Sequence, residues 1–146
     1  MRVLVMGSLN YDFVYDVDHI HRPGETIESM SMETYYGGKG LNQAIALSKA
    51  GVPVYISGLV GEDGEGLKNC CKEHGIDTTY LKTIKGKSGH AIIQVDKNGQ
   101  NSILLFGGAN RSQWRENIDE ILESFQAGDV LLLQNEMVDC IMKLDT

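Results

Sequence analysis

A glycine cluster with one lysine runs directly into a helical pattern at residues 36–47. Glycine lets the backbone turn and approach its neighbours closely, and the first turn of a helix presents backbone N–H groups at the positive end of the helix dipole. Such a corner suits an anion or an oxygen-rich ligand, which Lys39 and Asn42 would face from the first helical turn. The alternative is a tight strand-to-helix connection without a ligand, and this stretch alone does not separate the two.

The glycine cluster differs from two common nucleotide-binding motifs. Lys39 is followed by glycine, so the Walker A spacing G-x-x-x-x-G-K-[ST] is missing. The dinucleotide fingerprint G-x-G-x-x-G does not occur in the cluster either. The glycines therefore do not by themselves indicate a phosphate site.

A second set of polar side chains follows the first predicted strand. Residues 3–6 are a continuous apolar run, typical of a buried parallel strand, and ligands gather at the carboxyl ends of such strands. Ser8, Asn10 and Asp12 come next and alternate with apolar residues, which predicts one polar face on an extended segment. A carboxylate accepts two hydroxyl protons at once, which suits a vicinal diol. A solvated strand edge is the alternative interpretation.

The elements that would position these residues predict an α/β fold. Further buried strands are expected at residues 54–60 and 130–133, and helices at residues 64–74 and 114–125 as well as after the glycine cluster. The alternation of strands and helices predicts right-handed crossovers and a doubly wound parallel sheet with helices on both faces. Glu136 follows the strand at residues 130–133 and is therefore expected on the ligand side of the sheet.

Two other segments predict a small projecting β-sheet. Residues of about 11–36 and 89–106 are extended but too polar for the centre of a buried sheet, and Asn98 with Gly99 predicts a hairpin turn. His19 and His21 lie in the loop of the first segment. Because no carboxylate or cysteine stands at metal-ligand spacing from them, we expect both to be solvated, with metal binding as the alternative.

One acidic cluster could be taken for a metal site. Glu62, Asp63 and Glu65 stand at the predicted start of a helix, where negative charge favours the helix dipole. We therefore interpret them as helix-start residues and predict no metal site in this chain.

Composition restricts the partners and the cellular location. The chain has 146 residues, of which 42% are hydrophobic, enough for one globular domain but not for two. A net charge of −7 argues against nucleic acid, which requires clustered basic residues. No apolar run is long enough for a membrane span, and three cysteines without a C-x-x-C pair indicate reduced thiols. These features predict a cytoplasmic protein.

Several motifs together resemble the amino-terminal half of the ribokinase-type (PfkB) carbohydrate kinase family. They cover nearly the whole chain in the family's order and occupy residues 7–12, 23–26, 36–44, 58–64, 107–110 and 133–136. The resemblance implies that residues 1–146 are the amino-terminal part of a ribokinase-like domain, with a small β-sheet lid that also forms a homodimer contact. We accordingly expect the chain to be part of a longer protein.

The resemblance also implies a sugar site, with the glycine corner holding sugar rather than phosphate. The implied substrate-binding residues are Asn10, Asp12, Gly38, Lys39, Asn42 and Glu136. The family's catalytic base lies in a G-A-G-D motif of the carboxyl-terminal half, which is absent here. Residues 127–129 imitate part of it but precede a strand, so we expect no catalytic residue in this chain.

For the full-length protein, the resemblance implies transfer of the γ-phosphoryl group of ATP to a primary hydroxyl of a pentose, with ribose as the first choice. Mg²⁺ would be required, and K⁺ is a candidate activator. The chain alone is predicted to be inactive. Alternatives within the family are kinases of fructose, a nucleoside or a keto-deoxy sugar acid. A non-catalytic sugar-binding or interaction module is the alternative if the gene ends at Thr146.

Overall fold

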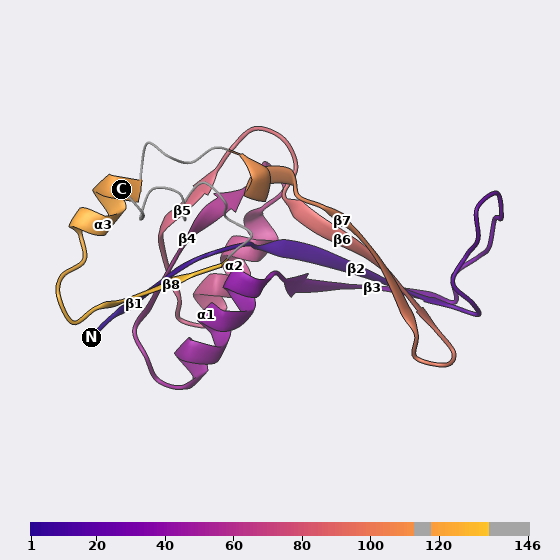
Figure 1. The fold of residues 1–146 in the computed structure, drawn as a ribbon, viewed down its shortest axis with the longest axis horizontal. Helices are drawn as coiled ribbons and strands as arrows, with labels where there is room; N and C mark the ends of the chain where they lie inside the picture. The colour runs from indigo at the N-terminus through magenta and orange to yellow at the C-terminus, as the bar shows by residue number, and fades with distance from the viewer. Residues whose placement is uncertain (113–117, 135–146) are drawn as a thin grey trace.

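Two β-sheets joined end to end form the molecule in a computed structural model that describes residues 1–112 and 118–134 (Figure 1). Sheet A has the strand order β5-β4-β1-β8, and each neighbouring pair is parallel. Its strands are β1 (Val3–Met6), β4 (Val54–Val60), β5 (Asp77–Thr83) and β8 (Val130–Leu133). The chain moves outward from β1 to β4 and β5 and then returns to the other side of β1, which is the topological switch of a doubly wound fold.

Helices cover both faces of sheet A, as predicted. They are α1 (Lys39–Lys49), α2 (Glu65–Glu73) and α3 (Ile118–Glu123). Val3 and Val5 of β1 join the hydrophobic cluster of α1 and α2, whereas Leu4 and Met6 join a second cluster with α3. Because successive side chains of a strand point to opposite faces, β1 is buried from both sides.

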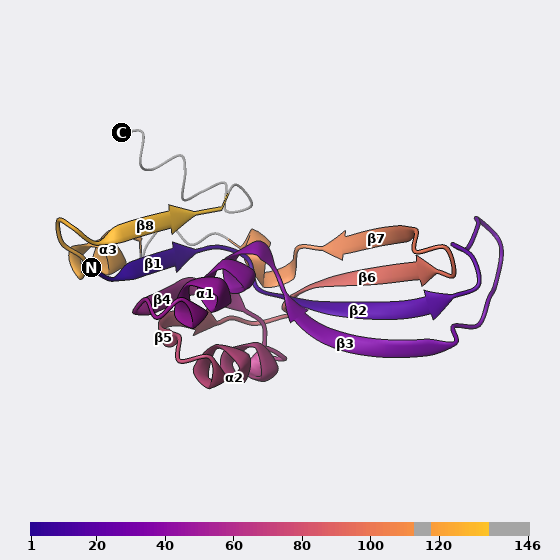
Figure 2. The ribbon, with the colours of Figure 1, turned by 90° about the horizontal axis from the view of Figure 1, so that it is seen from below.

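Sheet B projects from this body, as the sequence predicted (Figure 2). Its strand order is β3-β2-β6-β7, in which β2 and β6 are parallel and the outer pairs antiparallel. Its strands are β2 (Asn10–Val17), β3 (Ser31–Gly37), β6 (Gly89–Asp96) and β7 (Asn101–Phe106). The short 3₁₀-helix η1 (Gly108–Arg111) then leads back towards the body.

Two predictions about sheet A need correction. Strand β5 was not predicted, because polar residues dominate it and Leu81 is its buried side chain, as expected for an edge strand. Residues 130–133 were predicted to be a buried strand, but Val130 is 44% exposed. The reason is that β8 pairs only with β1 within the described part of the chain.

The predicted helix at residues 114–125 overlaps α3, while its first residues lie outside the described part. Cys70 and Cys71 of α2 are buried free thiols. Within residues 1–112 and 118–134, no helix combines the length and apolar character needed to cross a membrane.

Candidate functional site

Helix α1 begins directly on the carboxyl end of β1 because glycines allow the backbones to touch. Gly38 has a φ of 96°, and a Cβ there would lie 2.5 Å from the carbonyl oxygen of Ser8. A Cβ at Gly40 would lie 2.7 Å from the Cα of Gly7. Side chains at these positions would collide with backbone, so the glycine cluster serves a close approach as well as a turn.

Ser8 occupies much of the hydrogen-bonding capacity of the helix start. The backbone N–H of Lys39 donates to the Oγ of Ser8 at 3.2 Å, and that of Leu41 donates to the Ser8 carbonyl at 3.1 Å. The N–H of Asn42 donates to the carbonyl of Gly38. Since these N–H groups are already paired within the protein, the helix start is poorly suited to cradle a phosphate.

Asn10 sits at the first position of β2 and is buried against Asn110 of η1. The Oδ1 of Asn10 accepts a hydrogen bond of 2.7 Å from the Nδ2 of Asn110. Asn110 also bonds both backbone polar groups of Leu9, with distances of 3.2 Å and 3.1 Å. Asn10, the first residue of sheet B, is thus hydrogen-bonded to η1, the segment that follows the last strand of this sheet.

Asp12 lies two residues further along β2 and on the same face as Asn10, as the alternating pattern predicted. The opposite face carries Tyr11 and Phe13, which stack with their rings 6.2 Å apart. A Cβ added to Gly37 would lie 2.0 Å from the Oδ2 of Asp12, so the carboxylate packs against the residue before Gly38. Partial burial raises the pKa of Asp12. Its carboxylate therefore stands at the junction of β2, β3 and α1.

Lys39 and Asn42 lie on the exposed side of the first turn of α1. The carboxyl end of β8 reaches the same helix, because the Nε2 of Gln134 donates to the Oε1 of Gln43. A Cβ at Gly7 would lie 2.9 Å from the Gln134 side chain, so β8 also meets the glycine corner. The remaining predicted site residue, Glu136, lies outside the described residues.

A hollow of about 60 Å³ lies beside Asn10 on this face of sheet B. Its lining residues are Ser8, Asn10, Leu105, Gly107, Asn110 and Arg111. The structure thus brings Asn10, Asp12 and Gly38 to one junction, with Lys39 and Asn42 on the adjoining helical turn. Among the predicted site residues, Asn10 lines the hollow.

Asn110 is the residue of this site that the sequence analysis missed. Residues 107–110 were identified as one of the motifs of the family resemblance, without a role for Asn110. The sequence signal for a role of Asn110 was its position shortly after two glycines, where the chain leaves the last predicted strand of the projecting sheet. What the sequence could not give is its partner Asn10, which lies 100 positions earlier.

Sheet B is also anchored to the start of α2. The hydroxyl of Tyr11 donates to the carbonyl of Asp63 at 2.6 Å. The carboxylate of Asp63 accepts the N–H of Ser88 at 2.8 Å, and Glu62 accepts that of Gly86. Although burial acts to raise the pKa of Asp63, hydrogen bonds from Ser88 and Lys87 outweigh it and lower that pKa. These acids thus stabilise the turn that leads into β6.

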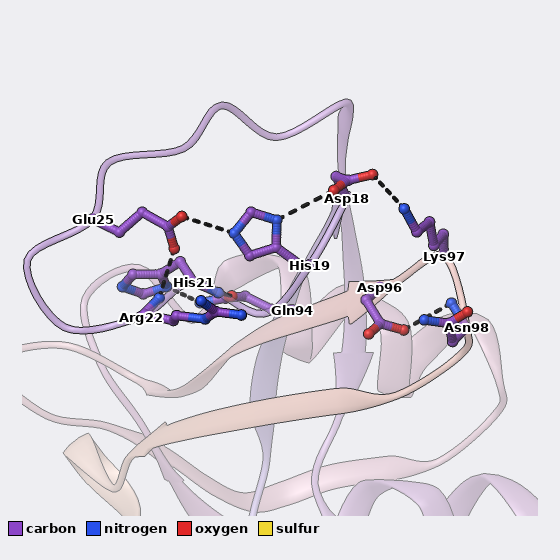
Figure 3. A network of polar contacts seen from close by, with 9 residues as sticks. All are labelled: Asp18, His19, His21, Arg22, Glu25, Gln94, Asp96, Lys97 and Asn98. Carbon is purple, nitrogen blue, oxygen red and sulfur yellow. Dashed lines mark hydrogen bonds and ion pairs between the residues drawn. The ribbon is translucent and has the colours of Figure 1, made fainter.

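The far end of sheet B places two carboxylates beside His19, whose side chain is 42% exposed. The Nε2 of His19 bonds Glu25 at 2.9 Å and its Nδ1 bonds Asp18 at 3.2 Å (Figure 3). Glu25 and then Asp18 raise the pKa of His19. His21 instead meets the Gln94 amide at 2.7 Å. In the described ranges, no three His, Cys, Asp or Glu residues are placed to hold a metal ion.

Family comparison agrees with this architecture. The family model of the pfkB carbohydrate kinases matches residues 1–145, so the chain belongs to this family. It is 38% identical to the ribokinase of Haemophilus influenzae over 135 residues, which cover 90% of this chain and 44% of that protein. The chain thus spans less than half the length of this relative.

Solved structures give the same result. A ribokinase from Thermotoga maritima superposes with a TM-score of 0.88 and 36% identity over 97% of this chain and 48% of that one. A ribokinase from Arabidopsis thaliana, solved with ribose and ATP, gives a TM-score of 0.79 and 34% identity over 92% of this chain and 45% of that one. The ribokinase-like α/β fold with its second sheet is therefore confirmed.

Proposed function

We propose that this chain is the sugar-binding part of an ATP-dependent kinase that phosphorylates a pentose, with ribose as the preferred substrate. The observation that carries the proposal is the junction of β1, α1 and sheet B, where Asn10 and Asp12 share one face. Amide and carboxylate groups side by side suit neighbouring sugar hydroxyls. Support also comes from the relatives named as ribokinases and from the Arabidopsis structure with ribose and ATP.

Each proposed sugar contact has its own physical basis. Asp12 accepts hydroxyl protons as a carboxylate, and Asn10 contributes its amide. Gly38 is proposed to contact the sugar through its backbone, because the lack of a Cβ lets this turn pack closely on Ser8 at the start of α1. Lys39 and Asn42 are proposed to reach the sugar from the exposed side of α1. Glu136 is proposed to complete the pocket from the segment after β8.

ATP and Mg²⁺ belong to the proposed full-length enzyme, in which the metal ion would neutralise negative charge on the nucleotide phosphates. No group of three potential metal ligands is found in the part of the chain that the structure describes, so we assign none of these residues to Mg²⁺. The catalytic base is proposed to lie in the carboxyl-terminal half. The 146-residue chain alone is accordingly proposed to be inactive.

Sheet B is proposed to act as a lid and to form a homodimer in the cytoplasm. Four consecutive apolar residues of β7 are at least half exposed: Ile103, Leu104, Leu105 and Phe106. Neighbouring side chains of a strand point to opposite faces, so both faces of β7 present apolar surface. Exposed apolar side chains gathered on one edge strand favour a protein–protein contact there.

A substrate panel on the full-length protein tests the proposed activity. With ATP and Mg²⁺, we expect the highest kcat/KM for ribose among ribose, fructose, a nucleoside and a keto-deoxy sugar acid. A higher value for another substrate would replace ribose within the same family. Binding of sugar without any phosphorylation would favour the non-catalytic module, and measurable turnover by residues 1–146 alone would contradict their proposed inactivity.

A further inference from the structure

We propose that Asn110 is a positioning residue that makes Asn10 present a hydrogen-bond donor, and not an acceptor, to the sugar. This inference rests on the proposed function, because it names the polarity of a contact within the same site. It concerns two amides that come from the first strand of sheet B and from η1, the segment after its last strand.

The orientation of the Asn110 amide is fixed by the backbone of Leu9. Leu9 N–H must donate, so it requires the Oδ1 of Asn110, found at 3.2 Å. The Leu9 carbonyl must accept, so it requires the Nδ2 of Asn110, found at 3.1 Å. Reversing this amide would place donor against donor and acceptor against acceptor at a buried position, which is costly.

The fixed Asn110 amide in turn fixes Asn10. An amide nitrogen carries two hydrogens, and the second one of Asn110 is donated to Asn10 at 2.7 Å. The atom of Asn10 that receives it must therefore be the oxygen Oδ1. The Nδ2 of Asn10 is left as its other polar group, and Asn10 lines the hollow beside Ser8.

Glycine at the start of β6 makes this arrangement possible. A Cβ at Gly89 would lie 2.1 Å from the Nδ2 of Asn110 and 2.4 Å from the Oδ1 of Asn10. Gly89 is also the register partner of Asn10 on the neighbouring strand. The packing therefore leaves room for the paired amides and for no side chain above them.

The result is a donor and an acceptor on one face of β2. Asn10 offers N–H groups, whereas the carboxylate of Asp12 only accepts when it is ionised. The pair suits two sugar hydroxyls with opposite roles: one accepts from Asn10 and the other donates to Asp12. We infer that the polarity of the first contact is set by Asn110, which need not touch the sugar.

The variant Asn110→Asp tests this inference in the full-length protein. It keeps an acceptor for Leu9 N–H but removes the donors to the Leu9 carbonyl and to Asn10. The Asn10 amide then turns its Nδ2 towards the new carboxylate and its Oδ1 towards the sugar. We expect ribose affinity, measured by calorimetry, to fall about tenfold or more. Asn101→Asp is the matched control, because it adds the same charge on exposed β7, and it should leave affinity unchanged.

A second variant covers the case in which Asn110→Asp does not fold. Asn10→Asp keeps the acceptor for Asn110 and replaces the outward Nδ2 by an oxygen, so it should weaken ribose binding by a similar factor. Ribose analogues that each lack one hydroxyl locate the contact. Removing the hydroxyl that accepts from Asn10 should weaken binding to the unmodified protein but should not weaken binding to Asn10→Asp any further. A merely structural role would not produce that pattern.

The outcomes separate the inference from the proposed function. If the unmodified protein binds no pentose, the proposed function fails. If it binds ribose, and a folded Asn110→Asp protein or the Asn10→Asp protein binds equally well, the positioning role is wrong. The positioning role is also wrong if Asn10→Asp binds ribose and every deoxy analogue more weakly than the unmodified protein by the same factor, because the loss of affinity then does not depend on one hydroxyl.

Discussion

Sheets A and B differ in what covers their faces. In sheet A, β1 is completely buried because α1 and α2 pack on one face and α3 on the other. In sheet B, no described helix packs across β7, whose six residues are all exposed. The first sheet thus carries its own hydrophobic core, whereas the second exposes apolar side chains.

This difference explains where the candidate site lies. A sheet buried on both faces has no surface left for a ligand except at the ends of its strands. A sheet with open faces offers surface but little rigidity of its own. Asn10 and Asp12 stand where the two meet, so the rigid body fixes their backbone while sheet B supplies the surrounding surface.

The largest expected effect is a core truncation in sheet A. Ile56→Ala removes a fully buried side chain of β4 and should lower the free energy of unfolding by about 2–5 kcal/mol. Leu104→Ala in sheet B removes a side chain that is 68% exposed and should change it by less than about 0.5 kcal/mol. Urea denaturation of the full-length protein measures both.

Equal losses at the two positions would contradict the distinction between the sheets. A loss at Leu104 that depends on protein concentration would sharpen it instead, because it would report that the exposed face of β7 is covered by a second copy.

The second prediction concerns the glycine contact between body and site. Gly40→Ala places a Cβ against the backbone of Gly7, so α1 must shift, at a cost of about 1–3 kcal/mol. Ribose affinity should fall with it. Gly24→Ala is the control for a loss of stability without a backbone collision, because Gly24 has a positive φ of 79°, which strains an alanine, and has nothing within 4 Å. It should lose stability and keep ribose affinity; loss of affinity in both variants would show that the contact with Gly7 is not the cause.

The third prediction uses pH to probe the edge of the body. Arg2 hydrogen-bonds Asp129 and lowers the pKa of that carboxyl from 3.8 to about 2. A lowered carboxyl pKa adds stability above the ordinary pKa, and this stability is lost as pH falls through the lowered value. We expect the unmodified protein to lose stability between about pH 4 and pH 2 more steeply than Asp129→Asn, as followed by thermal unfolding. Parallel curves for the two proteins would contradict this role of the ion pair.

The smallest effect is expected at the far end of sheet B. Glu25 and Asp18 raise the pKa of His19 above 6.5, so its contribution to the stability of this loop is present below that pH and is lost as pH rises through the raised value. NMR titration should give a His19 pKa above 6.5, and Glu25→Gln should lower it. A pKa that does not respond to Glu25→Gln would contradict the contact in Figure 3.

Strong local patterns explain why much of the fold was predictable. Continuous apolar runs identified β1 and β4, and the Asn98–Gly99 turn identified the hairpin of β6 and β7. The polar edge strand β5 was missed because its single buried residue, Leu81, creates no such pattern. Sequence periodicity reports burial, so it loses its signal where a strand is mostly exposed.

The candidate site was predictable in its parts and not in its assembly. The alternation after β1 placed Asn10 and Asp12 on one face, and the glycines marked the start of α1. The pairing of Asn10 with Asn110 was not predictable, because it depends on how sheet B folds back on the body. Nor did the pattern indicate that Ser8 would take up N–H groups of the helix start.

The central claim is that the junction of the two sheets binds a pentose through Asp12. Titration calorimetry of the full-length protein with ribose tests it most directly, with Asp16→Ala as a control further along the same face of β2. Asp12→Ala should weaken ribose binding by about 1–3 kcal/mol, and Asp16→Ala should leave it unchanged. Equal affinity of the Asp12→Ala and unmodified proteins for ribose would contradict the claim.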